Sequence, residues 1–231
     1  MKDVFGLIYT SDESDVRLRD LTRSRSIAAM PIGGRYRVID VLLSNMVHSD
    51  ITNVGLITQR NYHSLMDHLE SGKAWDLNRK RDGLFILPPY VTRSNTGGYA
   101  GMLDAIRSNL GYVRRASQRY ALISGSSTVF NTTFDDMMKK HMESGADITI
   151  LYNVPGEGEL FSDADRTYLK LDENNRVVDI EVSPHLHSYP NVSMDVYLMD
   201  KALLTYLVEI SAAHYLSLIH ISEPTRLDVI S

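Results

Sequence analysis

The residues best suited to chemistry stand together in Pro31–Asn45, PIGGRYRVIDVLLSN. The pair Gly33-Gly34 allows a tight turn that residues with a Cβ would resist. Arg35 and Arg37 follow, and two guanidinium groups at this spacing can point into one cleft and hold phosphate. The same pattern is also typical of a loop that enters a helix with two solvated arginines, because short motifs give many false positives. The pattern alone therefore leaves a phosphate site and an ordinary loop both open.

Other chemistry-bearing groups form weaker patterns. His63 and His68 are five residues apart, which does not place them on one face of a helix, so we expect no zinc site. Ser124, Ser126 and Ser127 have no histidine and aspartate at a readable spacing, so a hydrolase is not predicted. The chain has no cysteine, which excludes disulfides, thiolate metal sites and thiol catalysis. No metal site is predicted from these residues.

Composition excludes several classes of partner. The chain has 231 residues, 43% of them hydrophobic and 23% charged, with a formal net charge of −5. This is ordinary globular material without a basic field, so we expect no nucleic-acid partner. The first fifteen residues turn acidic after a short apolar run, which fits neither a signal peptide nor a membrane span. We therefore expect a cytoplasmic protein with no membrane partner.

Strand and helix patterns alternate along the chain. Short apolar runs predict strands at Val4–Tyr9, Asn53–Thr58, Leu84–Leu87, Ala121–Ser124, Ile148–Tyr152 and Val192–Met199. Helical patterns cover Val38–His48, Tyr62–Leu69 (with Leu65, Met66 and Leu69 on one face), Gly101–Arg115, Phe134–Glu143 and the start of a helix at Lys201–Ile210. A hairpin is predicted from Tyr168–Leu171 and Arg176–Val182. The alternation predicts an α/β fold with a parallel sheet that helices cover on both faces.

Five stretches together resemble ADP-glucose pyrophosphorylase (glucose-1-phosphate adenylyltransferase). They are Arg17–Thr22, Gly33–Asn45, Val54–Gln59, Tyr99–Ile106 (YAGMLDAI, family YRGTADAV) and Asn191–Tyr197 (NVSMDVY, family NASMGIY). The resemblance runs from about Val4 to Leu207. It implies a doubly wound, mostly parallel nucleotidyltransferase domain of Rossmann-like type, followed by a left-handed β-helix domain. It also implies cytoplasmic tetramers that use Mg²⁺, ATP and glucose 1-phosphate in the first step of glycogen or starch synthesis.

The chain departs from this family at four motifs. The glycine-rich loop LAGGRGTRL, which brings backbone N–H groups to phosphates, reads YTSDESDVRL in residues 9–18. Ile27 replaces the lysine of RAKP, and Ser126 replaces the aspartate of AGDH that holds Mg²⁺ in the family. The sugar-phosphate motif EKP reads VSP, with Ser183 in place of its lysine. All four losses remove charge stabilisation, and losing one such group commonly costs a hundred-fold in rate or more.

The departures suggest a subunit without catalytic residues. Arg17, Tyr99 and Ser193 match family positions near substrate, and they serve either ligand binding or packing. The combination resembles the GlgD type of bacterial subunit, which implies a regulatory partner of a catalytic GlgC-type chain in a hetero-oligomer. No cofactor is then expected, whereas an active enzyme would need Mg²⁺ and ATP. The alternatives are an active sugar nucleotidyltransferase and a module that senses a nucleotide, a sugar phosphate or an effector without an enzyme partner.

The last residues do not continue the family pattern. Leu216–Arg226, LSLIHISEPTR, agrees at every position with the translation of a common transposase sequencing adaptor. We therefore expect 1–215 to be a nucleotidyltransferase-like domain that is incomplete at its C-terminal end, and 216–231 to be a non-native tail. On this hypothesis the chain is truncated, the β-helix domain is missing, and the tail is poorly ordered or docked only by chance.

Overall fold

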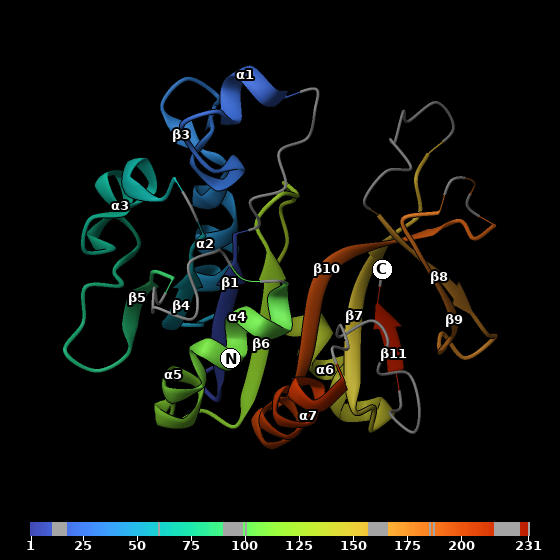
Figure 1. Ribbon diagram of the computed structural model, residues 1–231. Coiled ribbons are helices and arrows are strands. Elements are labelled where there is room, and N and C mark those ends of the chain that lie inside the picture. The colour runs from blue at the N-terminus through green and yellow to red at the C-terminus, as the bar shows by residue number, and fades with distance from the viewer. Residues whose placement is uncertain are drawn as a thin grey trace.

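The computed structural model describes residues 1–10, 18–59, 61–89, 99, 101–156, 166–184, 186, 188–214 and 227–230. Its strands are β1 (Val4–Tyr9), β2 (Pro31–Ile32), β3 (Tyr36–Arg37), β4 (Asn53–Ile57), β5 (Gly83–Leu87), β6 (Tyr120–Gly125), β7 (Ile148–Asn153), β8 (Thr167–Leu171), β9 (Val177–Val182), β10 (Asn191–Asp200) and β11 (Leu227–Ile230). Its α-helices are α1 (Arg19–Thr22), α2 (Val38–His48), α3 (His63–Leu69), α4 (Met102–Ser108), α5 (Leu110–Arg115), α6 (Asp135–Ser144) and α7 (Lys201–His214). The described part of the chain also contains two 3-10 turns, η2 (Ile27–Ala29) and η3 (Lys73–Trp75) (Figure 1).

One sheet organises the molecule, with the strand order β11-β7-β10-β6-β1-β4-β5. Strands β6, β1, β4 and β5 are parallel, whereas β10 runs antiparallel between β6 and β7. The hairpin β8–β9 joins the sheet through β10. From β1 the chain moves outward to β4 and β5 and then returns to β6 on the other side of β1. The topological switch point therefore lies between β1 and β6, where such sheets commonly bind ligands outside the carboxyl ends of the strands.

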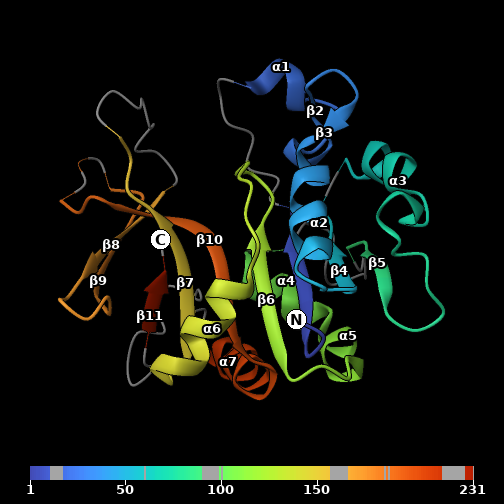
Figure 2. The same ribbon diagram turned by 180° about the vertical axis from the view of Figure 1, so that it is seen from behind.

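Helices cover both faces of the sheet. One face packs against α4, α5 and α7 through a core that contains Phe5, Leu7, Ile123 and Ile106. The other face packs against α2 and α6 through a core that contains Ile8, Leu43, Leu122 and Met137. Figures 1 and 2 show these two layers from opposite sides. The doubly wound, mostly parallel α/β fold predicted from the sequence is confirmed. Apolar side chains of β1 point alternately into the two cores, as expected for a strand that is covered on both faces.

Two local predictions are wrong. The helix predicted over Gly101–Arg115 is divided at Asn109 into α4 and α5. The Asn109 amide donates to the carbonyl of Ala105, and asparagine side chains that bind nearby backbone carbonyls compete with helix geometry. On α3, Leu65 and Leu69 are buried as predicted, but Met66 is 38% exposed because it lies off the buried stripe.

The amino edge of the sheet, where the parallel strands begin, holds a buried chain of paired polar groups. The Tyr112 hydroxyl donates to Asn53 Oδ1 at 2.8 Å, and Asn53 Nδ2 donates to Gln118 Oε1 at 2.9 Å. Gln118 Nε2 then donates to Asp82 Oδ1 at 3.2 Å. Burial, with a smaller contribution from the charge of Asp82, raises the pKa of Tyr112 well above its usual range, so the phenol stays a donor. These bonds fix the starts of β4, β5 and β6 relative to α5.

The C-terminal residues end in an edge strand. Leu227–Ile230 pairs in parallel with β7, while residues 215–226 lie outside the described ranges. The exposed edge of a strand offers backbone donors and acceptors to almost any segment. The prediction of a non-native tail from residue 216 therefore stays a prediction. None of the helices in the described ranges is long and apolar enough to cross a membrane.

Candidate functional site

The described residues at the carboxyl edge of the sheet, where β1, β4 and β6 end, include several buried hydroxyl groups. Tyr9 and Gly125 are register partners across the switch point, and Thr10 and Ser126 follow them and are buried. Thr10 donates from Oγ1 to the Ile57 carbonyl at 3.3 Å. Thr58, which follows β4, is fully buried, and its Oγ1 has no hydrogen-bond partner in the described part of the chain. At Ser126 a hydroxyl group thus stands where the resemblance implies an aspartate.

Strand β10 contributes a carboxylate to this edge. The β10–β7 register shifts between Ser193 and Val196, and Asp195 in this bulge has φ +56°. The Asp195 N–H donates to Ser193 Oγ at 3.1 Å. A Cβ built on Gly125 would lie 3.3 Å from Asp195 Cβ and 3.8 Å from its Oδ2. The Asp195 side chain therefore lies directly against the end of β6.

Tyr197 lies beneath that carboxylate. Its hydroxyl donates to Asp195 Oδ1 at 3.4 Å. Burial first, and then the charge of Asp195, raise the pKa of Tyr197 far above its ordinary value. The phenol is consequently a neutral donor near neutral pH. It supports a negatively charged carboxylate rather than competing with it.

Tyr99 belongs to the core more than to an open surface. It is 8% exposed and lies in the cluster with Leu103 and Ile106. Its N–H donates to Gln59 Oε1 at 3.0 Å, and Gln59 Nε2 donates to the Tyr9 hydroxyl at 2.6 Å. Gln59 thereby connects the ends of β1 and β4 to Tyr99. Packing in the core is enough to explain a tyrosine at position 99, and a role of Tyr99 in ligand binding stays a prediction.

The remaining predicted positions lie apart from one another. Ile27 is half-buried in η2, which packs against α2 and α3. Ser183 is exposed beyond β9, with φ +47° and its N–H donating to the Arg166 carbonyl at 2.7 Å. Arg17 lies outside the described residues. Of the predicted site residues, the structure brings Ser126 and Ser193 to the same edge: Ser126 directly follows β6, and Ser193 lies on the neighbouring strand β10.

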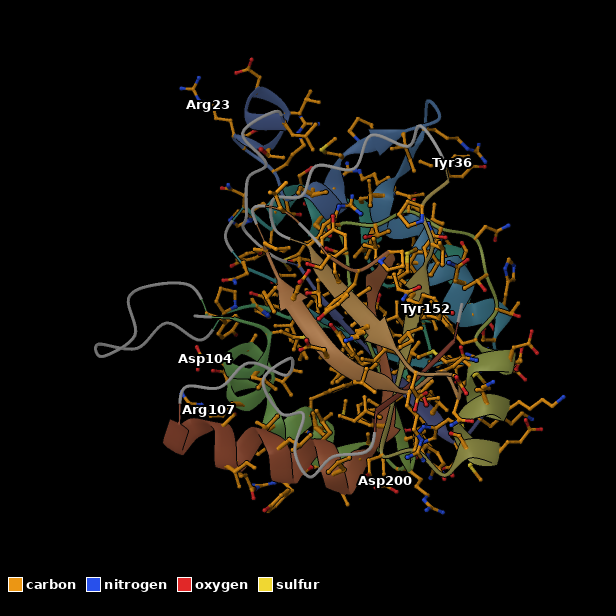
Figure 3. All side chains as sticks on the ribbon, turned by 90° about the vertical axis from the view of Figure 1, so that its right-hand side faces the viewer. Arg23, Tyr36, Asp104, Arg107, Tyr152 and Asp200 are labelled. Atoms are coloured by element: carbon orange, nitrogen blue, oxygen red, sulfur yellow. The ribbon has the colours of Figure 1, made fainter. Side chains whose placement is uncertain are left out.

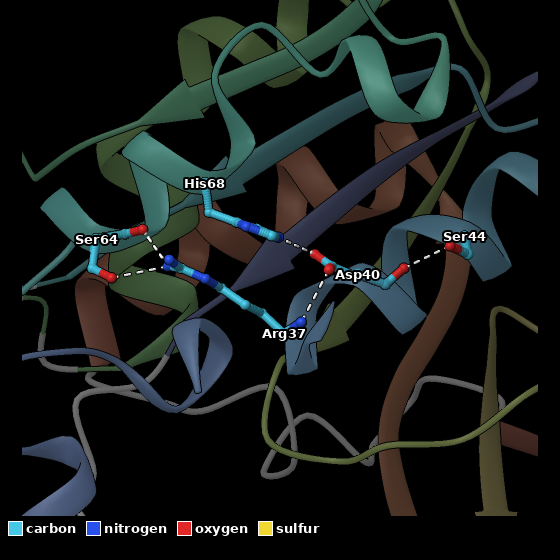
Figure 4. Close-up of polar contacts among 5 residues, drawn as sticks. All are labelled: Arg37, Asp40, Ser44, Ser64 and His68. Carbon is cyan, nitrogen blue, oxygen red and sulfur yellow. Dashed lines mark hydrogen bonds and ion pairs between the residues drawn. The ribbon is translucent and has the colours of Figure 1, made fainter. Parts of the chain in front are cut away.

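The two arginines of the GGRYR stretch go to different places. Arg37 Nη1 donates to the Ser64 hydroxyl at 2.9 Å and also to the Ser64 carbonyl, whereas the Arg35 guanidinium lies 5.3 Å from the centre of the Tyr36 ring. They do not share a cleft, because the Arg37 guanidinium is hydrogen-bonded to Ser64 of α3 (Figure 4).

Asp40 and His68 form a second contact between the same helices. Asp40 Oδ2 accepts from the Arg37 N–H at 3.0 Å, and Asp40 Oδ1 lies 2.7 Å from His68 Nε2 (Figure 4). His68 in turn meets Trp75 edge-on at 6.2 Å. Asp40 therefore joins the first turn of α2 to α3, which makes this part of the GGRYRVIDV stretch a structural clamp.

Sequence reasoning missed Asp195, Gln59 and the Asp40–His68 pair as site or support residues. Asp195 had a readable signal, because it stands where NASMGIY has glycine. Asp40 and His68 had none, since they are 28 residues apart on different helices. Within the described ranges, no group of three His, Cys, Asp or Glu side chains could hold a metal ion.

Comparison with known proteins agrees with this geometry. The family model for nucleotidyl transferases matches residues 14–222. The chain is 45% identical over 135 residues to the glycogen biosynthesis protein GlgD of Bacillus subtilis, a match that covers 58% of the chain and 39% of the relative. It is 37% identical over 206 residues to the glucose-1-phosphate adenylyltransferase of Thermomicrobium roseum, covering 88% and 47%. The chain spans about two fifths to one half of the length of these relatives.

A solved structure shows the same fold at lower sequence similarity. A protein described as a glucose-1-phosphate thymidylyltransferase of Bacillus anthracis, solved with sucrose, superposes with a TM-score of 0.73 at 15% identity, covering 99% of this chain and 87% of that one. The relatives named above confirm the resemblance to ADP-glucose pyrophosphorylase and to its GlgD type. Because the family model covers most of its length, the chain belongs to the nucleotidyl transferase family.

Proposed function

We propose that this chain is a non-catalytic, regulatory subunit of a glucose-1-phosphate adenylyltransferase that functions in glycogen biosynthesis. The observation that carries the proposal is Ser126. It lies buried where β6 ends at the switch point, and a neutral hydroxyl stands there in place of the carboxylate that the family resemblance implies. Such a site retains the scaffold of the enzyme but lacks its main means of charge stabilisation.

The described residues do not fit the Mg²⁺ ion that the family implies. Magnesium prefers an octahedral set of hard oxygen ligands, usually one or two carboxylates together with water and substrate phosphates. At this edge the buried side chains of Thr10 and Ser126 offer only neutral hydroxyls. Within the described ranges the Asp195 carboxylate belongs to no group of three His, Cys, Asp or Glu side chains that could hold a metal ion. We therefore derive no catalytic step through Mg²⁺ or ATP.

The partner proposed for this chain is a catalytic GlgC-type subunit in a hetero-oligomer. Two relatives named as glycogen biosynthesis protein GlgD, from Bacillus subtilis and Geobacillus stearothermophilus, support this assignment at 45% and 46% identity. A subunit that binds a catalytic chain can change that chain's affinity for substrate by a coupling free energy, typically a 5- to about 150-fold effect. ATP, glucose 1-phosphate or an effector would act through this coupling.

The test is ADP-glucose synthesis by three samples: this protein alone, a catalytic subunit alone, and the two together. The source DNA is first resequenced across the codon for Tyr215, and the samples use the protein that this DNA encodes. We expect no turnover from this protein alone and a several-fold change in the substrate affinity of the mixture relative to the catalytic subunit. Turnover by this protein alone at a rate comparable with the catalytic subunit would refute the proposal.

A further inference from the structure

Helix α2 is bonded at its first turn to another helix. Arg37 Nη1 donates to the Ser64 hydroxyl at 2.9 Å, and Asp40 Oδ1 lies 2.7 Å from His68 Nε2 (Figure 4). Ser64 and His68 both belong to α3. The first turn of α2 is therefore fastened to α3 by two side-chain contacts.

The other end of α2 holds the loop of residues 126–134, which joins β6 to α6. Asn45 Nδ2 donates to the Phe130 carbonyl at 2.8 Å, and Asn45 Oδ1 accepts from the backbone N–H two residues further on at 3.4 Å. Ser49, the C-cap residue of α2, accepts from the Phe134 N–H at 2.8 Å through its Oγ. The loop contains no helix or strand of its own, so side chains at this end of α2 fix its backbone.

The contact from Asn45 is buried and uses both sides of its amide. Asn45 is 1% exposed, and its donor and its acceptor both bind the loop. The Ser49 hydroxyl reinforces this arrangement, because it donates to the Asn45 carbonyl at 2.8 Å. Buried polar groups rarely stay without partners. The loop therefore cannot move apart from α2 without losing bonds that are costly to leave unmade.

The loop held in this way continues the strand that ends at the switch point. Ser126, its first residue, directly follows β6. Sheets of this kind bind ligands outside the carboxyl ends of their strands, through residues on loops that the scaffold positions. The position of the 126–134 loop therefore shapes the candidate ligand edge.

Between its two sets of contacts, α2 is one stiff element. It is an unbroken helix of 11 residues, and its side chains Ile39, Leu43 and Met46 are fully buried in the core on this face of the sheet. Packed helices shift as units rather than bending locally. A displacement that begins at the first turn of α2 therefore reaches Asn45 and Ser49 at its end.

We propose that α2 is a coupling element that transmits changes between α3 and the 126–134 loop at the carboxyl edge. A partner or ligand that displaces α3 changes the loop, and a ligand that orders the loop stabilises α3, because coupling between two sites is reciprocal. The biological role of this coupling rests on the proposed function. It gives a regulatory subunit a route between a contact at α3 and its ligand edge.

The experiment is amide hydrogen exchange of the full chain, read by NMR at both ends of α2. His68→Ala removes a contact at the α3 end and is scored at the far end, at the N–H groups of Thr132 and Phe134. Ser49→Ala removes the acceptor of the Phe134 N–H and is scored at the backbone N–H groups of α3. The matched control is His48→Ala, which removes an exposed histidine from the same helix.

Helix α7 is the reference for overall stability, because it packs against the opposite face of the sheet from α2. Asp200, which directly precedes α7, is labelled at the bottom of Figure 3, whereas Tyr36, which closely precedes α2, is labelled near the top. A variant that is less stable throughout speeds exchange in α7 as well. A variant that acts through α2 leaves α7 unchanged.

Each of the two variants should speed exchange at its far end by at least about fivefold, the lower end of typical coupling between sites. His48→Ala should change neither end, and exchange in α7 should stay the same in all three variants. A change confined to the near end in either variant would overturn the proposal, and so would an equal increase in α7. Turnover by this protein alone would refute the proposed function and leave the exchange data unaffected, so the two failures are distinguishable.

Discussion

The two edges of the sheet use buried polar groups in opposite ways. At the amino edge, Tyr112, Asn53 and Gln118 form a continuous chain of hydrogen bonds at 2.8 and 2.9 Å. At the carboxyl edge, the Thr58 hydroxyl is fully buried with no partner among the described residues, and Asp195 holds a left-handed backbone. The parallel strands thus begin at a paired network, in which Asp82 is itself left-handed with φ +63°, and end beside a buried hydroxyl that has no partner among the described residues.

This contrast separates buried polar groups that are paired within the described chain from a buried hydroxyl that is not. Buried polar groups normally find partners, so an exception requires an explanation. Strain and unpaired groups collect at functional sites because ligands, rather than the protein, are their partners. The buried Thr58 hydroxyl, which has no partner among the described residues, gives the carboxyl edge this character of a ligand site.

The largest effect is expected from breaking the amino-edge chain with Asn53→Ala. Asn53 is 4% exposed, and its loss leaves the Tyr112 hydroxyl and the Gln118 amide without their partner. Unpaired buried groups cost about 1–3 kcal/mol each, so we expect a loss of about 3 kcal/mol in the free energy of unfolding, measured by urea denaturation. The exposed Asn78→Ala is the control. A loss below about 0.5 kcal/mol would place Asn53 among ordinary surface sites.

The sequence was sufficient for most of the fold because local periodicity decides individual elements. The bounds of β1 and α2 were predicted to the residue, since each is a short segment with an unbroken apolar pattern. The antiparallel insertion of β10 between β6 and β7 was not predicted, because strand order depends on contacts far apart in the sequence. The break at Asn109 depends on a side-chain bond that the helical pattern does not reveal.

The site was less predictable than the fold for the same physical reason. The loss of charge at Ser126 could be read from one position of a motif. The placement of Asp195 against the end of β6 depends on a bulge, a positive φ and the absence of a Cβ at Gly125, which only the folded chain brings together. A glycine-to-aspartate change in NVSMDVY was the visible trace of that arrangement.

A smaller effect is expected where α2 begins, from His68→Ala. This change removes the 2.7 Å contact to the buried Asp40 carboxylate but leaves the bond from the Arg37 N–H. Hydrogen bonds to charged groups contribute about 1.5–3 kcal/mol to the free energy of unfolding. Because Asp40 keeps the bond from the Arg37 N–H and His68 is partly exposed, we expect a loss near the lower end of this range. Trp75, the single tryptophan, lies beside His68 and reports unfolding by fluorescence. His48→Ala, an exposed histidine on α2, should change stability less, and equal losses would contradict the clamp.

The carboxyl edge should respond in the opposite direction to Thr58→Val. Valine has nearly the same shape as threonine but lacks the hydroxyl that is buried without a partner. Removing an unpaired buried hydroxyl should stabilise the fold by about 1 kcal/mol, visible as a higher urea midpoint. Thr10→Val is the matched variant, because the Thr10 hydroxyl donates to the Ile57 carbonyl and its loss should not stabilise. Stabilisation by both changes, or by neither, would remove the contrast between paired and unpaired groups.

The smallest effect is expected at Tyr189, on the surface. Comparing Tyr189 with the buried Tyr197 tests whether a hydrogen bond or burial is the main cause of each raised pKa. The bond from Tyr189 to Asp179 at 2.6 Å is the main cause that raises the pKa of Tyr189 to about 12, and the same bond is the main cause that lowers the pKa of Asp179. Asp179→Asn should therefore return the Tyr189 pKa toward 10.0. The pKa is measured from tyrosinate absorbance, with Tyr189→Phe as the reference that lacks this phenol.

The sign of the stability change follows from these directions. Because the folded pKa of Tyr189 is raised, the contribution of the bond is complete below pH 10.0 and is lost as the pH rises through about 12. Because the folded pKa of Asp179 is lowered, its contribution is complete above pH 3.8 and is lost as the pH falls through the folded value. For Tyr197 burial is the first cause, so Asp195→Asn should leave its pKa high. If both asparagine variants lowered their tyrosine's pKa equally, the carboxyl edge would be governed by its charge alone and not by burial.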